Sequence, residues 1–587
     1  MIGRGTRLKA TRVTPLAAAL GAVSCLGGLQ TAWAQSAFAA PVSPAAASAA
    51  PAGSGVRFTF DGELSQGLIW RTENRKAALV GPSNGGTAST DLEDDGNLNS
   101  KRGTLVSAPT TLLATVEAES GAHRVLLRGS LLYDGRVTSA WRHWGTDPNP
   151  EGRRDEVHDA VGRRARLLDA YYAANLQAGE GSVEFKLGRQ TIMWGEAKFL
   201  PAGINMFNPV EAWKTHKAGV SLKEMILPVA AASVTWQPSA AVTLQGFYQL
   251  ERAKFEYDPV GTFFSDIDIL GQGAGDQTIV PGAPPLVREA DRNQNRNGQY
   301  GVAAFTRLQD WSVGVYFQNL HQRAAKVSGL GFMGRTGYFW EWPDDVKTYG
   351  LSFNRGLGSA AISGEVAVRR GMPIGLDASA VGAARANAAL CGAVIRAPAN
   401  CGVDFSQPPF NIPVPPLFTT PLRADASGYV RGWTRVNQVA FNLGLTQAFS
   451  GSDALPRLLG ANGGALFLET SAVRSTLPDQ AALPTQVKDR WHGAFFGQLG
   501  LDYLRVGGSN ITVTPKVIVQ TWLYGNDPTQ APFYKGRWAV TPALAIRHEQ
   551  SPDISFEIGY TTITDNGHAA HPLADRDYLA VQLKWAF

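Results

Sequence analysis

The chain has 587 residues, three cysteines and a formal net charge of +5, and 44% of its residues are hydrophobic. Four basic residues precede Ala34, so the chain without its first 34 residues carries about +1. The absence of a basic tail or stripe in the sequence excludes a typical nucleic-acid-binding protein. We find no zinc-helix histidine pair, phosphate loop or nucleophile elbow, so the sequence predicts no catalytic residue, cofactor or metal.

The first 34 residues have the order of a cleavable secretory signal peptide. Basic residues come first, an apolar run extends from Leu16 to Leu29, and Ala32-Trp33-Ala34 has the small-x-small pattern of a cleavage site. We expect cleavage after Ala34. A membrane anchor is the lesser alternative because the run is short and rich in Ala and Gly, and a lipoprotein signal at Cys25 has weak support.

The mature chain is expected to begin with a segment that has no core of its own. Residues 35–55 are dominated by Ala, Pro and Ser, which predicts a periplasmic lead-in. Two cysteines remain after cleavage, Cys391 and Cys401. In an exported chain their short separation favours one loop disulfide over a metal site.

The two ends of the mature chain alternate apolar and polar residues with the period of a β-strand. Val56, Phe58 and Phe60 share one face of the first strand, and Trp585 and Phe587 share one face of the last. About ten alternating residues are enough for a tilted strand to cross a bilayer. A terminal Phe resembles the signature that barrel assembly machinery reads. The edge strand of a soluble β-sandwich is the alternative for this stretch alone.

The lengths of the connections separate these alternatives. Tight turns such as Ser120-Gly121-Ala122 and Gly356-Leu357-Gly358 alternate with long polar stretches such as 136–164 and 372–428. This alternation is typical of a transmembrane antiparallel β-barrel with short periplasmic turns and long extracellular loops. We predict an all-β fold, a single barrel over residues 56–587, with about 18 strands and 16 as the fallback.

The polar parity of each strand predicts which side chains face the lumen. Arg189 departs from its parity, and we predict a bulge at Gly188 that turns it inward. The charges are of mixed sign, which does not favour a strongly ion-selective pore. The lumen and transport candidates are Arg124, Arg128, Asp134, Asp169, Tyr171, Arg189, Gln245, Glu251, Glu365, Arg369, Lys516 and Lys584.

Two further patterns carry weaker predictions. Trp311, Trp340, Trp342, Trp522 and Trp585 lie near predicted strand ends, which favours an interfacial aromatic belt over a port for hydrophobic cargo. Residues 91–96 begin like a calcium loop, but an arginine stands at the position of the bidentate glutamate.

An ordered set of motifs resembles a large proteobacterial family of outer-membrane β-barrels of unknown function. They are Gly-Arg-Gln-x-x-x-Trp-Gly-Glu at 188–196, Gly-Ile-Asn at 203–205 and Asn-Pro-Val at 208–210. The resemblance covers about Phe58 to Phe587. The family-pattern positions are Gly188, Arg189, Gln190, Trp194, Gly195, Glu196, Asn205, Asn208 and Pro209.

The resemblance implies a barrel in the outer membrane of a Gram-negative bacterium, in contact with lipid and lipopolysaccharide. It also implies association with an inner-membrane exporter of the resistance-nodulation-division kind. We expect a non-enzymatic, porin-like channel or transport component for a small hydrophobic or amphipathic molecule. The alternatives are a non-conducting surface or assembly barrel that binds a partner through its loops, and a membrane-embedded hydrolase built from loop residues.

Overall fold

The computed structural model describes residues 55–88, 90–139, 155–200, 203–277, 285–394, 396, 399, 420–527, 535–564 and 572–587. The predicted signal peptide and almost all of the lead-in lie outside these residues. Among the described residues, no helix combines the length and the hydropathy that crossing a membrane requires.

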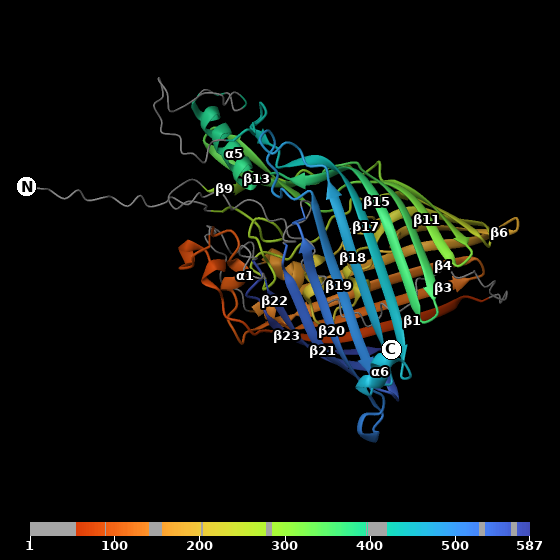
Figure 1. Cartoon of the computed structure of the whole chain (residues 1–587). Coiled ribbons are helices and arrows are strands. Elements are labelled where there is room, and N and C mark those ends of the chain that lie inside the picture. The colour runs from red at the N-terminus through yellow and green to blue at the C-terminus, as the bar shows by residue number, and fades with distance from the viewer. Residues whose placement is uncertain are drawn as a thin grey trace, which may run out of the picture.

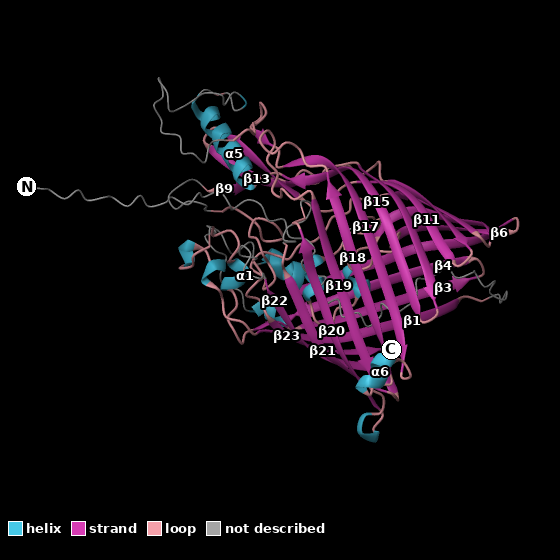
Figure 2. Cartoon of the chain, in the orientation of Figure 1, coloured by secondary structure: helices cyan, strands magenta, loops and turns pink. Residues whose placement is uncertain are grey.

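Eighteen antiparallel strands form a closed barrel, which confirms the larger of the two predicted strand numbers (Figures 1 and 2). Consecutive strands are hydrogen-bonded neighbours, and β1 pairs with β23 to close the ring. The strands are β1 (Arg57–Arg71), β3 (Pro109–Ser120), β4 (His123–Asp134), β5 (Arg163–Ala178), β6 (Gly181–Gln190), β7 (Val229–Ser239), β8 (Val242–Gln249), β10 (Tyr300–Leu308), β11 (Trp311–Leu320), β14 (Val346–Leu357), β15 (Ala360–Gly375), β17 (Trp433–Ser450), β18 (Gly463–Ser475), β19 (Trp491–Asp502), β20 (Ile511–Tyr524), β21 (Trp538–His548), β22 (Ser551–Thr564) and β23 (Tyr578–Ala586).

The short connections gather at the end of the barrel that carries the C-terminus, and the long ones gather at the other end. The turn between β17 and β18 is longer than its neighbours because it contains α6 (Ala454–Leu459). Figure 1 shows α6 near the C-terminus, whereas α1 (Asp95–Leu98) and α5 (Ala378–Val394) lie at the opposite end. We call these ends periplasmic and extracellular, following the predicted topology.

Three of the long connections, after β8, β11 and β15, contribute strands to a second, smaller sheet at the extracellular end. Its strands are β9 (Leu286–Arg288), β12 (Lys326–Phe332), β13 (Arg335–Glu341) and β16 (Tyr429–Val430), and α5 packs against β12. The remaining elements are β2 (Leu105–Ser107), α2 (Gly135–Ser139), α4 (Leu222–Met225) and the short helices at Ala77–Leu79, Pro82–Asn84, His158–Gly162, Ala212–His216 and Val506–Gly508. In α5, Cys391 is buried and disulfide-bonded, whereas its predicted partner Cys401 lies outside the described residues.

The barrel wall is apolar outside and polar inside, as the alternation predicts. On β4, Leu127 and Leu131 are exposed, whereas Ser130 and Asp134 are buried. The same division holds along most of the wall, so an apolar surface is presented to the surroundings while polar groups gather within the barrel. This is the arrangement that a bilayer requires, because lipid cannot solvate charges.

The tryptophans that were predicted to form an aromatic belt differ in their exposure. Trp585 is half-exposed on the outer face. Trp522, by contrast, is 3% exposed inside the barrel, and Trp342 is 6% exposed beside the extracellular sheet. Strand-end position alone did not distinguish these inward and loop tryptophans from those at the outer surface.

Candidate site in the lumen

The long connection between β6 and β7 folds into the barrel. We call its described residues, 191–200 and 203–228, the inserted segment. Its aromatic and aliphatic side chains pack on inward-facing residues of the wall: Phe199 stacks on Phe496 at 4.2 Å between ring centroids, and Trp194 lies 4.9 Å from Phe247. A hydrophobic core therefore occupies the inside of this barrel, and the inserted segment supplies much of it.

Two glutamates on one side of the ring hold the backbone of this segment. The Glu365 carboxylate on β15 accepts hydrogen bonds from the amides of Glu196, Ala197 and Ile204. The Glu469 carboxylate on β18 accepts from the amides of residues 198, 199 and 200 at 2.9–3.1 Å. Hydrogen bonds to a charged group are the stronger kind, so each carboxylate fixes a turn of otherwise irregular chain.

The other end of the segment is bound to the opposite side of the ring. Lys217 Nζ lies 2.5 Å from Asp134 on β4 and 2.9 Å from Ser107. The amide of Gly219 donates to Gln582 on β23, and its carbonyl accepts from Ser65 on β1. Because β1 and β15 lie on opposite sides of the ring of strands, the inserted segment crosses the lumen and narrows it.

Most of the predicted lumen residues take part in pairs. Arg128 bonds Asp169 at 2.9 Å, Lys516 bonds Glu557 at 2.6 Å, and Lys584 lies 3.4 Å from Glu63. The remaining members contact polar or aromatic groups of the lumen: Arg124 faces Glu184 and Tyr171, Gln245 accepts from Trp194, and Arg369 donates to the carbonyl of Gly203.

Arg189 is an exception, and the predicted bulge at Gly188 is wrong. The pairing of β6 with β5 and β7 continues through both residues without a shift. Arg189 is paired with Ala170, which is in turn paired with the exposed Leu127, so it lies on the outward face. Gly188 has φ +131°, which residues with a side chain rarely adopt, and a Cβ there would lie 2.2 Å from the carbonyl oxygen of Ala170.

Neighbouring acceptors compensate the outward charge of Arg189. Its Nη1 bonds Glu251 at 2.8 Å, and its Nη2 donates to the carbonyl of Pro228 at 2.9 Å. An unpaired arginine facing the middle of a bilayer would cost about 2–4 kcal/mol. Glu251, a second predicted lumen residue, thus pairs at the rim of the wall rather than deep inside the barrel.

The other family-pattern residues shape the inserted segment. The Asn208 side chain accepts from the amide of Ile192 and donates to the carbonyl of Leu227, which ties the two ends of the segment together. Gly195 has φ +89° and lies so close to the Glu365 carboxylate that a side chain would collide with it. Trp194 is buried, Gln190 bonds β7, Glu196 lies by Asn354, Asn205 contacts Met193, and Pro209 accepts from Leu227.

Sequence reasoning missed Glu469, Lys217 and Gln318, although each contacts the inserted segment or is part of it. Glu469 is the single acidic residue of β18, on its buried parity. A lone carboxylate among uncharged neighbours is the signal that could have identified it.

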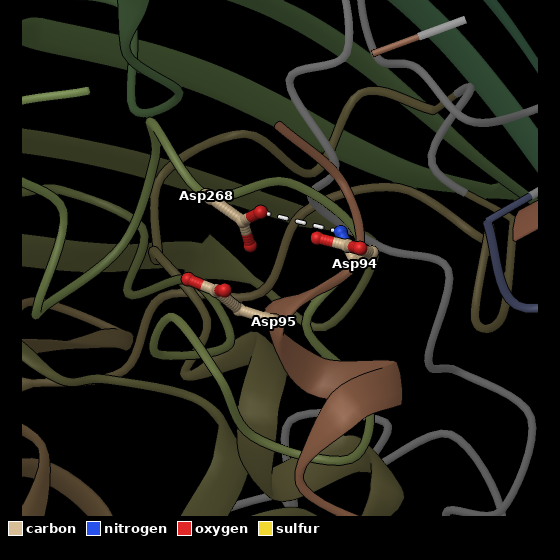
Figure 3. A group of neighbouring side chains, drawn as sticks. All are labelled: Asp94, Asp95 and Asp268. Carbon is tan, nitrogen blue, oxygen red and sulfur yellow. Dashed lines mark hydrogen bonds between the residues drawn. The ribbon is translucent and has the colours of Figure 1, made fainter. Parts of the chain in front are cut away.

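Three aspartates from the long connections converge, as Figure 3 shows. Asp94 and Asp95 come from the connection after β1, and Asp268 comes from the connection after β8. One oxygen of each lies within 4.8 Å of the others, a separation that the ligand shell of Ca²⁺ allows. The predicted calcium loop used a different set of residues from the first connection alone.

Hydrogen bonds orient these carboxylates. The amide of Asp94 donates to Asp268 at 3.2 Å, while Asp94 Oδ2 accepts from the amide of Gly81 at 2.7 Å. Burial, followed by repulsion from Asp95 and Asp94, raises the pKa of Asp268 well above its usual range. The three side chains could hold a cation, but protonation relieves the same repulsion, so the cluster does not by itself define a metal site.

A cavity lies beside the extracellular end of β5. Its volume is about 650 Å³, within the range of small-molecule sites. Phe255, Tyr257, Trp340 and Trp342 line it together with charged residues that include Arg189 and Glu251. The charged lumen and this cavity are thus the two places where the described part of the barrel could accept a solute.

Fold and site together define a closed 18-stranded antiparallel barrel whose lumen is narrowed by an inserted segment. Residues 17–587 match the profile of a family described as "Protein of unknown function (DUF1302)", and the chain belongs to that family. This confirms the resemblance to a family of unknown function. The association with an exporter remains a prediction, and no curated protein matches the chain.

Several solved structures are similar over 90% of this chain. Pseudomonas aeruginosa OccK9 (OpdG) has 12% identity, 98% coverage of its own chain and a TM-score of 0.39. Acinetobacter baumannii OccAB1 has 9% identity, 96% coverage of its own chain and a TM-score of 0.39. P. aeruginosa OccK2 (OpdF) in complex with glucuronate has 8% identity, 98% coverage of its own chain and a TM-score of 0.38. At these identities and scores the likeness carries no argument about function.

Proposed function

We propose that this protein is a channel or transport component in the outer membrane of a Gram-negative bacterium, and that it passes a small hydrophobic or amphipathic molecule. The observation that carries the proposal is the inserted segment, which is bound to both sides of the ring and narrows a lumen lined by paired charges. Such a segment selects solutes by their size and chemistry, while the strands provide a rigid wall. We assign no enzymatic activity to the barrel.

Solute flux through the purified protein tests this function. Liposomes that contain the mature chain should admit a small solute such as arabinose and an amphiphile such as laurate faster than protein-free liposomes. Deletion of residues 196–206, which removes the backbone held by Glu365 and Glu469, should increase arabinose flux. Liposomes that stay impermeable to both solutes, with and without the deletion, would contradict a channel.

A non-conducting surface barrel that binds a partner is the second candidate function. The small extracellular sheet and α5 favour it, because they form a structured layer beyond the barrel wall. Deleting residues 378–428 removes α5 and leaves β15 and β17 intact. Loss of partner capture with unchanged flux would support this candidate, and altered flux would support the channel.

The partners outside the lipid are proposed on the resemblance alone. They are an inner-membrane exporter of the resistance-nodulation-division kind and, during biogenesis, the barrel assembly machinery. A photo-crosslinker placed at Gly356, at the periplasmic end of β14 with open space around it, should capture the exporter in cells. Crosslinks that do not include an inner-membrane protein would contradict the association.

A further inference from the structure

The barrel wall is incomplete at the extracellular end of β5. This strand pairs with β4 as far as Arg163, but its pairing with β6 extends no further than Ala170. After Gln190 the chain leaves the wall and enters the lumen as the inserted segment. Among the described residues, 163–169 therefore have a strand neighbour on one side only, which leaves about 20 Å of strand edge unpaired at 3.3 Å per residue. A wall in lipid normally has no such edge.

The 650 Å³ cavity occupies this break in the wall. Leu167 and Arg189 line it from the outward face, and Leu167 is 54% exposed. Arg166 lines it from the inward face, where it pairs with Glu211 and Glu256. Because residues of both faces line one cavity, the cavity passes through the plane of the wall.

Arg189 bridges the break at its periplasmic side. Its guanidinium reaches the carbonyl of Leu168 on the unpaired edge at 3.4 Å, the carbonyl of Pro228 before β7 at 2.9 Å and the Glu251 carboxylate at 2.8 Å. These contacts replace the missing strand pairing with side-chain bonds, which are easier to open than a hydrogen-bonded ladder. The family pattern thus places an arginine at the boundary of the break.

The lining of the cavity is complementary to an amphipathic anion. Trp340 and Trp342 supply apolar faces, and Lys254 Nζ lies 3.5 Å from the ring centre of Trp342. Lys254 and the exposed Arg252 form no ion pair within the described residues, whereas Arg166 and Arg189 are both paired with glutamates. Arg252 donates to the carbonyl of Gln294 at 2.7 Å and Lys254 donates to the side chain of Asn293, while Asp291 lines the same cavity. Two cations outside ion-pair distance of any described carboxylate, next to aromatic walls, favour an anionic head group with an apolar body.

We propose that the break between β5 and the start of β7 is a lateral passage for an amphipathic organic anion. The head group binds between Arg252 and Lys254, and the apolar body lies against the tryptophans and extends past Leu167 towards the outer leaflet of the membrane. The proposal rests on the channel function above and adds a substrate class and a route through the wall.

Filling the outer mouth of the passage tests the route. Leu167→Trp adds bulk at the break, and Leu443→Trp makes the same change at a residue of equal exposure, 54%, on a continuous part of the wall. In liposomes with the full mature chain, Leu167→Trp should reduce laurate flux by about tenfold and leave arabinose flux unchanged. Leu443→Trp should change neither. If Leu167→Trp leaves laurate flux unaltered, or lowers both fluxes equally, the lateral route is overturned.

Direct binding tests the head-group site and separates it from the channel function. Radiolabelled laurate should bind saturably to the mature chain in nanodiscs, after subtraction of empty discs. Arg252→Ala with Lys254→Ala should weaken binding by about tenfold, whereas removing the same charge with Lys101→Ala and Arg307→Ala should not. Saturable binding without flux of either solute would contradict the channel and retain the site. Equal affinity in both double variants would overturn the site.

Discussion

At the scale of single residues, most charged side chains inside the barrel form ion pairs or hydrogen bonds with specific partners. Parity along each strand predicted that Arg128, Asp134 and Glu365 point inward; Asp134 and Glu365 are buried, and Arg128 pairs with the buried Asp169. Parity could not predict their partners, because Asp169 is 41 positions from Arg128 and Lys217 is 83 positions from Asp134. Arg189 was wrongly predicted to turn inward. Its strand parity pointed outward, and the sequence did not show that Glu251 and Pro228, beyond the strand, supply hydrogen-bond acceptors there.

Replacing Glu469 should loosen the inserted segment. Glu469→Gln removes the charge that three backbone amides share, and each charge-assisted hydrogen bond contributes about 1.5–3 kcal/mol. We expect a larger single-channel conductance in planar bilayers and faster tryptic cleavage after Lys198. Glu180→Gln, in an exposed periplasmic turn, is the control. Unchanged conductance and cleavage would mean that other contacts hold the segment.

At the scale of elements, the strands were well predicted and the long connections were not. Alternation with period two extends over whole strands, so their existence and faces could be recognised. The hairpin of β12 and β13 has the same alternation but is buried among loops, so local pattern could not place it outside the wall. The Ala-rich α5 lacks the regularly spaced polar residues that would distinguish an amphipathic helix from a flexible loop in the sequence.

Loss of the last residue should impair closure of the barrel. Phe587 exchanges two backbone hydrogen bonds with Gly62, and its ring lies 4.9 Å from that of Trp585. Deleting Phe587 removes these contacts beside the β1–β23 seam, so we expect less folded, heat-modifiable protein in outer-membrane fractions. Phe58→Ala, a change at another exposed aromatic of β1, should leave the folded yield close to that of the wild type. Equal yields for the deletion and the wild type would contradict this role.

The three aspartates should make the loop that carries α1 sensitive to pH. Asp268 contacts this loop through the amide of Asp94, and its raised pKa means that the folded protein binds a proton more tightly than the unfolded chain, in which the carboxyl titrates at about 3.9. The resulting stabilisation is fully present below that value and is lost as pH rises through the folded pKa. Hydrogen exchange, corrected for its intrinsic rate, should therefore show less protection of residues 95–98 at neutral pH than at acidic pH.

Asp268→Asn should abolish most of this dependence, because the amide keeps the shape and carries no charge. Asp553→Asn, at an exposed residue in β22, should behave as the wild type does. Protection that increases with pH would indicate that the ionised carboxylates are stabilised, for example by a bound cation, and would contradict the protonated cluster.

At the scale of the whole molecule, a buried ion pair joins connections from the two ends of the sequence. Arg71 at the end of β1 bonds Asp575 before β23 at 3.1 Å, and both side chains are fully buried. Asn97 completes the group by donating to Asp575 and accepting from Arg71. The pair lies above the seam where β1 and β23 close the barrel.

Breaking this pair should destabilise the closed barrel. Arg71→Ala removes the nearer of the two arginines that pair with the buried Asp575, since Arg576 lies at 3.7 Å, and breaking a buried pair typically costs about 3–5 kcal/mol. Arg57→Ala, at the other end of β1, breaks an exposed pair with Glu119 and should cost at most about 1 kcal/mol. Urea unfolding in lipid vesicles measures both changes, and equal effects would contradict the structural role of the buried pair.

The sequence by itself determined the class of the fold. Its period-two alternation, its short and long connections and its terminal aromatic strand are local patterns that reflect a wall with lipid on one side and polar groups on the other. The tertiary structure decided what lies inside and across that wall. Three features depend on contacts between residues far apart in the chain: the path of the inserted segment, the convergence of Asp94 with Asp268 and the break beside β5. Local periodicity cannot predict such contacts, because it reflects only residues that are neighbours in sequence.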